Sequence, residues 1–174
     1  MTAPALSALS ALLGDRFSTA RPVCAAHAQS ETHIRTGLPD AVVFPETSAE
    51  VAAILRICAA HRLPVIGWGA GTSLEGHALP LHAGVSVDFA RMNRVLSVSP
   101  EDMLVRVQPG ITREDLNREL RATGLFFPVD PSTWQRCTIG GMAANNSCGS
   151  KSIRYGLMAD NVLAIDALLA DGSR

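Results

Sequence analysis

The chain is 174 residues long, with 47% hydrophobic and 18% charged residues, which is enough for one good hydrophobic core or two small ones. Its 15 Lys and Arg residues against 16 Asp and Glu residues leave a formal net charge of −1. This balance excludes a general electrostatic attraction to nucleic acid or to an anionic membrane surface. We therefore expect no nucleic-acid partner, and any anionic ligand must be held by local backbone geometry.

The spacing of the metal-ligating residue types argues against a metal centre. The four cysteines include no Cys-x-x-Cys pair, which argues against a zinc ribbon, an iron–sulfur ligand set or a thioredoxin-type site. The five histidines show no two-ligand helical spacing. The N-terminus lacks the pattern of a signal peptide and no apolar run is long enough to span a bilayer. We expect a reduced, cytoplasmic chain, with peripheral attachment to the inner membrane left open.

The N-terminal third predicts a helical arm followed by a strand, a helix and a strand. Residues 6–13 suit a short helix that ends at Gly14, and residues 1–36 are interpreted as an arm. Residues 41–44 form an apolar run, and Thr47 with Glu50 makes a capping box for a helix to about His61. Its apolar residues recur at the spacing of one helix face.

A strand at residues 64–66 completes a β-α-β unit over residues 40–66, whose two strands should be parallel. This strand runs into a loop of glycines at alternate positions with two hydroxyl side chains. The loop residues are Gly69, Ala70, Gly71, Thr72 and Ser73. Glycine allows successive N–H groups to converge on an anion. Open α/β sheets bind ligands at the carboxyl ends of their strands, so the loop is a candidate phosphate site; its alternative is a tight strand exit with no ligand.

The middle of the chain predicts three more strands and a second capped helix. The strands are expected at residues 84–88, 94–98 and 103–107, the last on a new layer. The capping pattern of Thr112 and Asp115 opens a helix that ends near Gly124. A composition shift near residues 99–100 predicts a subdomain boundary, which gives subdomains at 37–98 and 99–174.

The C-terminal residues predict a turn without its second strand. Residues 161–170 are almost continuously apolar and meet Asp171-Gly172, a strong hairpin signal. Only two residues follow. We expect the second subdomain to be truncated, with functional residues lying beyond Arg174.

A second segment rich in glycine, alanine, serine and asparagine follows at residues 137–149. Small side chains suit a segment whose backbone approaches a large flat or charged ligand, although an ordinary long surface loop has the same composition. A Rossmann site fails because Leu74 stands where the third glycine is needed, and no capped helix follows immediately. A Walker A motif fails because no Gly-Lys-Ser/Thr occurs.

When the glycine loop and the segment at residues 137–149 are considered together, the sequence resembles the FAD-linked oxidases of the vanillyl-alcohol oxidase and p-cresol methylhydroxylase superfamily. It is most similar to the branch of D-lactate dehydrogenase (cytochrome) and glycolate oxidase. The motifs that carry this resemblance are residues 69–77, 91–93, 114–117, 124–131 and 154–156. The implied fold is α+β: a two-subdomain FAD-binding domain of the p-cresol methylhydroxylase type, with the second subdomain incomplete.

The resemblance implies which residues hold FAD. The glycine loop would bind the diphosphate, mostly through backbone N–H groups. The rest of the FAD site would be lined by Asp130, Pro131, Cys137, Thr138, Gly141, Ala144, Asn145, Asn146, Ser147 and Gly149. Thr72 stands where some relatives carry a histidine linked to the flavin, so we expect non-covalent FAD.

Several side chains have roles that the resemblance leaves as hypotheses. Cys137 and Cys148 are expected to be small buried residues near FAD and not thioether links to it. Lys151 or Arg154 would compensate negative charge on the reduced cofactor. Trp68 either covers the edge of the flavin or packs beneath the loop.

The activity implied is that of a flavin-dependent 2-hydroxyacid dehydrogenase, with D-lactate as the expected substrate and a cytochrome, quinone or flavoprotein as electron acceptor. Glycolate and D-2-hydroxyglutarate are alternative substrates. The catalytic residues would lie in a C-terminal substrate domain, so this chain alone is expected to be inactive. Two competing hypotheses are a reductase of cell-wall precursor synthesis, which has a similar loop, and a non-catalytic nucleotide-binding domain.

Overall fold

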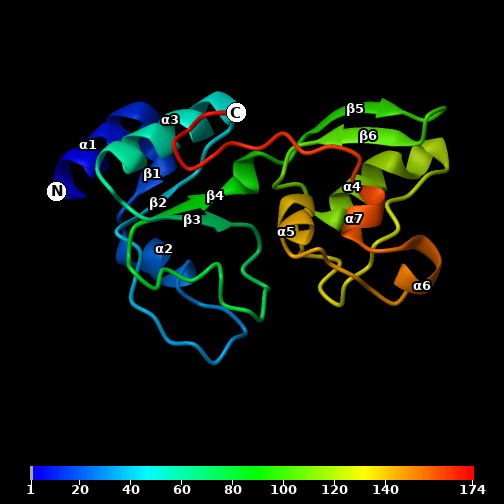
Figure 1. The fold of residues 1–174 in the computed structure, drawn as a ribbon, viewed down its shortest axis with the longest axis horizontal. Coiled ribbons are helices and arrows are strands. Elements are labelled where there is room, and N and C mark those ends of the chain that lie inside the picture. Colours follow the sequence, from blue (N-terminus) through cyan, green and yellow to red (C-terminus); the bar gives the residue numbers. More distant parts are fainter. Residues whose placement is uncertain (1) are drawn as a thin grey trace. The chain divides into compact units, whose positions relative to one another are not determined.

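The computed structural model describes residues 2–174 and contains both helices and strands in two compact units (Figure 1). The first unit comprises the residues up to Arg91 together with Asp166–Arg174, and the second is Met92–Ile165. Among the residues described, no helix is long and apolar enough to cross a membrane. The domain boundaries inferred from the sequence stay a prediction.

The first unit is built on a four-stranded sheet. Its elements are α1 (Thr2–Leu13), β1 (Phe17–Ser18), α2 (Arg21–Ala26), β2 (Ala41–Val43), α3 (Ser48–Ala60), β3 (Val65–Trp68) and β4 (Val85–Asp88). The strand order is β1-β2-β4-β3. Both β2 and β3 pair with β4 in parallel, and β1 pairs with β2 antiparallel. The predicted parallel direction of β2 and β3 is confirmed, although β4 lies between them.

The predicted cap of α3 is present. The hydroxyl of Thr47 accepts a hydrogen bond from the backbone N–H of Glu50 at 3.2 Å. The carboxylate of Glu50 in turn accepts two bonds from Arg16, at 2.6 and 2.7 Å. The first turn of α3 is thereby tied to the 3₁₀ turn at Gly14–Arg16 that follows α1.

The two faces of this sheet are covered by different helices. On one face, α1 and α3 form a core with the strands that contains Leu9, Leu13, Val43, Ile54, Cys58, Val85 and Val87. Successive residues of a strand point to opposite faces, so Asp88 lies on the face away from Val87. There it meets His27, at the C-terminal end of α2. Residues 1–36, interpreted from the sequence as an arm, therefore also contain a short strand, β1, and a helix, α2, that covers part of the sheet.

The second unit contains a two-stranded sheet and short helices. Its elements are β5 (Val95–Ser99), β6 (Leu104–Val107), α4 (Arg113–Leu120), α5 (Ile139–Ala144), α6 (Ser152–Tyr155) and α7 (Met158–Asn161). Thr112 caps α4, and the 3₁₀ turn that follows α4 ends at Gly124 in the left-handed region, as expected. One small core surrounds Leu116 on α4, and another surrounds Met142 on α5.

Two expectations about strands differ from the structure. The strand expected at 94–98 in the first layer pairs antiparallel with β6 and not with the first sheet. The continuously apolar residues 161–170 form no strand; they begin as the last residue of α7 and continue as an extended segment. A strand needs a neighbouring strand for its backbone groups, and none pairs with residues 162–169 among the described residues.

Candidate functional site

The glycine loop leaves the carboxyl end of β3, beside the end of β4. All five of its residues, 69–73, are half-buried. Within the part of the chain that the structure describes, no backbone hydrogen bond uses an N–H group of these residues. The loop therefore presents a run of available donors at the edge where parallel sheets bind ligands. This donor set fits a diphosphate.

Gly71 lies directly against the indole of Trp68. Its φ angle is +65°, in the region that residues with side chains rarely adopt. A Cβ atom at this position would lie 2.7 Å from Cη2 of Trp68, too close for any side chain. Trp68 itself is 9% exposed. Of the two roles expected for Trp68, the structure shows the second, a side chain packed beneath the loop.

The end of the loop is tied to neighbouring residues. The hydroxyl of Ser73 donates to the carboxylate of Glu75 at 2.5 Å. The backbone carbonyl of Ser73 accepts from the hydroxyl of Ser30 at 2.5 Å. The bond from Ser73 lowers the pKa of Glu75. Because its hydroxyl is engaged, Ser73 is left to contribute its backbone N–H to an anion.

A buried histidine lies below Trp68. His27 is 7% exposed, and its ring centroid is 4.8 Å from that of Trp68. Nδ1 is 2.9 Å from the carbonyl oxygen of Val23, and Nε2 is 3.0 Å from Oδ2 of Asp88. Burial opposes the charged form of His27, but the hydrogen bonds and the Asp88 charge outweigh it and raise the pKa of this histidine above 6.5. No motif in the sequence pointed to His27.

The second glycine-rich segment forms α5 and the loop after it, in the second unit. Thr138 caps α5 by accepting from the N–H of Gly141 at 3.2 Å. The small or amide residues from Gly141 to Asn146 are largely exposed, whereas Cys137 and Thr138 are buried. Most of the predicted residues in this segment are therefore accessible to a ligand.

Asp130 and Gly149 meet within the same unit. Asp130 accepts from the hydroxyl of Ser150 at 2.9 Å and from the N–H of Lys151 at 3.0 Å. The bond from Lys151 contributes most to a lowered pKa of Asp130. A Cβ atom at Gly149 would overlap the Asp130 carbonyl. Asp130 therefore holds the turn at 149–151 through these hydrogen bonds. Pro131, which follows it, is half-buried.

The two cysteines of this segment differ. Cys137 is buried in the core with Met142, and burial raises the pKa of its thiol. Cys148 is exposed, so the expectation that it would be buried is wrong. The reason is that Cys148 lies in the loop after α5, and this loop is not part of the core around Met142. The expectations for Lys151 and Arg154 stay predictions: their cationic groups lie over the rings of Phe126 and Tyr155, at 5.6 and 5.3 Å.

Arg113 is a buried cation that no sequence motif indicated. It is 7% exposed, and its guanidinium lies 5.8 Å from the centroid of the Trp134 ring. Among the described residues its Nε has no hydrogen-bond partner. Its backbone N–H donates to the carbonyl of Cys137 at 3.1 Å. Its positive charge acts on the thiol of Cys137 and on the carboxylate of Asp130, so this charge lies near the second predicted segment. The sequence shows only an arginine in the first turn of a helix, which is ordinarily exposed.

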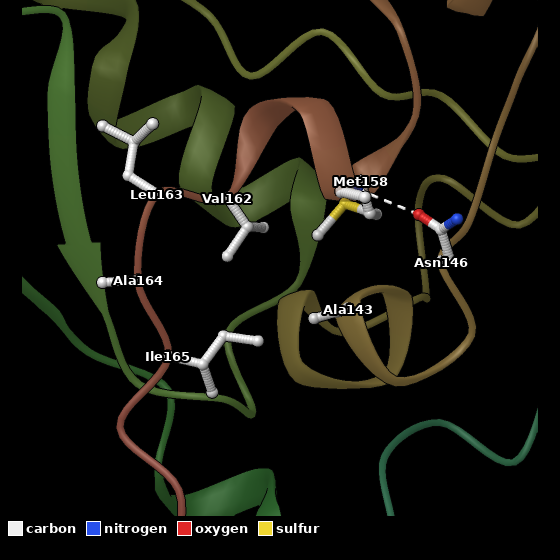
Figure 2. Close-up of a pocket in the computed structure, with 8 residues that line it drawn as sticks. Ala143, Asn146, Met158, Val162, Leu163, Ala164 and Ile165 are labelled. Carbon is white, nitrogen blue, oxygen red and sulfur yellow. Dashed lines mark hydrogen bonds between the residues drawn. The ribbon is translucent and has the colours of Figure 1, made fainter.

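An apolar cavity of about 310 Å³ lies beside α5. Figure 2 shows Asn146 at one side of it and Val162, Leu163 and Ile165 on the extended segment after α7. Of its lining residues, only Asn146 was predicted as a site residue; its Oδ1 accepts from the N–H of Ala159 at 2.9 Å. The others are apolar, and sequence alone does not distinguish cavity walls from core residues.

In the part of the chain described, no three His, Cys, Asp or Glu side chains are grouped so that they could hold a metal ion. The predicted site residues fall into two sets, residues 69–73 in the first unit and residues 130–149 in the second. A glycine loop with open N–H donors at the carboxyl end of a parallel strand defines the class: a nucleotide-binding domain of the mixed α and β kind.

Comparison with known proteins identifies the family. Residues 39–174 match the family described as FAD binding domain. The chain belongs to this family, and FAD is its cofactor. The fold agrees: p-cresol methylhydroxylase with substrate bound superposes with a TM-score of 0.76 at 22% identity, covering 85% of this chain and 30% of that one. Alkyldihydroxyacetonephosphate synthase superposes with a TM-score of 0.85 at 25% identity, covering 92% and 32%.

Curated relatives share more of the sequence. The chain is 41% identical over 169 residues to a probable mitochondrial D-lactate dehydrogenase of Danio rerio, covering 97% of this chain and 34% of the relative. It is 38% identical to the glycolate oxidase subunit GlcD of Bacillus subtilis (78% and 29%) and 41% identical to the D-2-hydroxyglutarate dehydrogenase of Escherichia coli (78% and 14%). The chain spans about a third or less of the length of these relatives. The expected fold class, superfamily and cofactor are confirmed, whereas the individual site residues stay predictions.

Proposed function

We propose that this chain is the FAD-binding portion of a flavin-dependent dehydrogenase that oxidises D-lactate to pyruvate and passes the electrons to a cytochrome or quinone. The observation that carries the proposal is the open donor set of the glycine loop, in a chain 41% identical to a D-lactate dehydrogenase across 97% of its length. Two further relatives, from Arabidopsis thaliana and Saccharomyces cerevisiae, are described as cytochrome-linked D-lactate dehydrogenases.

In this proposal the two sets of residues have different tasks. The N–H groups of Gly69, Ala70, Gly71, Thr72 and Ser73 bind the diphosphate, because each charge-assisted hydrogen bond contributes about 1.5–3 kcal/mol. The exposed residues after Thr138 line another part of the cofactor. Arg113 adds a positive charge on that side, which favours an anionic ligand. FAD, when bound, supplies the acceptor for a hydride from the α-carbon of the substrate.

We propose that FAD is held without a covalent bond, since the loop offers Thr72 and no histidine at the expected position of attachment. The residues that act on the 2-hydroxy acid are proposed to lie outside these 174 residues, in a substrate domain of the longer protein. This chain alone would then not turn over D-lactate.

Two competing functions are compatible with the same fold, and each predicts a different result in a test of activity. Glycolate or D-2-hydroxyglutarate is the substrate in the first, because relatives with those names match the chain almost as well. A non-catalytic nucleotide-binding domain is the second, and it predicts cofactor binding without reduction by any 2-hydroxy acid.

The experiment is spectroscopic. The full-length protein that contains this chain is purified, its flavin absorbance is recorded, and D-lactate, glycolate or D-2-hydroxyglutarate is added without oxygen. We expect the purified protein to contain flavin, and we expect denaturation to release it. Of the three acids, D-lactate should bleach the flavin absorbance fastest. Bleaching only by another acid would support the first competing function; flavin that no 2-hydroxy acid bleaches would support the second. Absence of flavin would overturn the proposal.

A further inference from the structure

His27 occupies a position that core packing alone does not explain. A neutral imidazole carries one N–H and can donate only one hydrogen bond, whereas the imidazolium donates two. Both ring nitrogens of His27 face an acceptor, the Val23 carbonyl and the Asp88 carboxylate. Asp88 is itself fixed, because its other oxygen accepts from the N–H of Ala90 at 2.8 Å. The geometry therefore favours a buried, doubly bonded imidazolium.

A continuous path of contacts connects this imidazolium to the glycine loop. Trp68 and Asp88 are direct neighbours on β3 and β4, so their side chains share one face of the sheet. The His27 ring lies against the Trp68 ring at 4.8 Å, and the indole lies against Gly71. The chain after His27 reaches the far end of the loop, where Ser30 donates to the carbonyl of Ser73.

We propose that His27 is a positioning residue for the glycine loop: its imidazolium, held between Val23 and Asp88, fixes the Trp68 indole on which Gly71 lies. This inference rests on the proposed role of the loop in binding the FAD diphosphate. The contacts of His27 are with Val23, Asp88, Trp68 and Phe44, so it acts on the loop through Trp68. Preorganised N–H groups bind an anion more tightly, because less conformational freedom is lost on binding.

The proposal makes the affinity of the loop depend on pH. Among the described residues, Asp88 on β4 is the ionisable group in contact with His27; Trp68 from β3 and Phe44 after β2 carry no charge. His27 has a raised pKa in the folded chain. The contribution of the His27 imidazolium to holding the loop is therefore fully present below pH 6.5. It is lost as the pH rises through the higher pKa that His27 has in the folded chain.

The first test follows Trp68 directly and needs no cofactor. The chain has two tryptophans, so Trp134→Phe leaves Trp68 as the only indole. Emission is then recorded between about pH 5.5 and 9, because an imidazolium in ring contact quenches indole emission. We expect one transition centred above 6.5, which disappears in a second variant that adds His27→Gln. A flat profile in the Trp134→Phe chain, or a transition that survives His27→Gln, would overturn the proposal.

The second test measures FAD affinity in the full-length apoprotein. We expect His27→Ala to weaken FAD binding about tenfold, with His27→Gln intermediate and without the pH dependence of the unchanged protein. The matched control is His82→Gln, an exposed histidine of the same unit, which should leave affinity unchanged. Unaltered affinity in both His27 variants would refute the positioning role, whereas failure of the unchanged protein to bind FAD would refute the proposed function and leave the Trp68 result standing.

Discussion

At the scale of single residues, Gly71 is the position where backbone conformation and packing impose the same requirement. Its φ angle of +65° makes a side chain strained, and its contact with Trp68 leaves no room for one. Alternating glycines in the sequence predicted the first of these constraints. The second was not predictable, since nothing in a linear sequence says that an indole three residues earlier folds back beneath the loop.

We predict that Gly71→Val removes FAD from the full-length protein and lowers the free energy of unfolding by about 1–3 kcal/mol, because the side chain imposes strain and displaces Trp68. Flavin content and urea denaturation measure the two effects. Gly67→Ala is the control: its Cβ would meet Cε2 of Phe89 at an ordinary 3.8 Å. Full flavin content in Gly71→Val would contradict the phosphate assignment of the loop.

At the scale of secondary structure elements, the N-terminal end of α3 is held by two devices of different range. The cap by Thr47 is local and was readable as a four-residue pattern. The paired hydrogen bonds between Glu50 and Arg16 span 34 positions of sequence, so no local sequence pattern predicts them. The antiparallel pairing of β5 with β6 is local by comparison, since Ser99 pairs with Leu104 across a short turn; the composition shift near residues 99–100 instead predicted a subdomain boundary between these two strands.

Glu50 should make the free energy of unfolding depend on pH in the acid range. The hydrogen bonds from Arg16 lower its pKa to about 2 from 4.5, so its contribution is present above about pH 4.5 and is lost as the pH falls towards 2. We expect Glu50→Gln to reduce the free energy of unfolding at pH 7 by about 1–3 kcal/mol and to flatten its dependence on pH below 4.5. Denaturation at several pH values measures this, with the exposed Glu31→Gln as control. Equal acid sensitivity in Glu50→Gln would contradict it.

At the scale of the whole molecule, the 174 residues leave apolar surface exposed. Leu163 and Ile165, on the extended segment after α7, are 79% and 69% exposed. Contiguous exposed apolar residues favour association with other surfaces. The chain spans about a third of the length of its D-lactate dehydrogenase relative, so this surface is consistent with the proposal that further protein contributes to the complete enzyme.

We predict that the 174-residue chain associates with itself and binds an apolar dye, and that the double variant Leu163→Ser and Ile165→Thr reduces both. Sedimentation and dye fluorescence are the measurements. Leu12→Ser, at a residue that is only 38% exposed, should have little effect. If the double variant associates as strongly as the unchanged chain, another surface is responsible.

The amino-acid sequence by itself determined the local chemistry: the glycine loop, the capped helices, most of the strand positions and the membership of a FAD-binding family. Each of these depends on neighbours within a few positions or on motifs in a defined order. Only the tertiary structure decided that Trp68 lies beneath Gly71, that Glu50 pairs with Arg16, that Arg113 is buried and that His27 meets Asp88 across 61 positions. These contacts join residues that are distant in sequence or turned towards each other by packing, and the interactions that hold them arise only when the chain is folded.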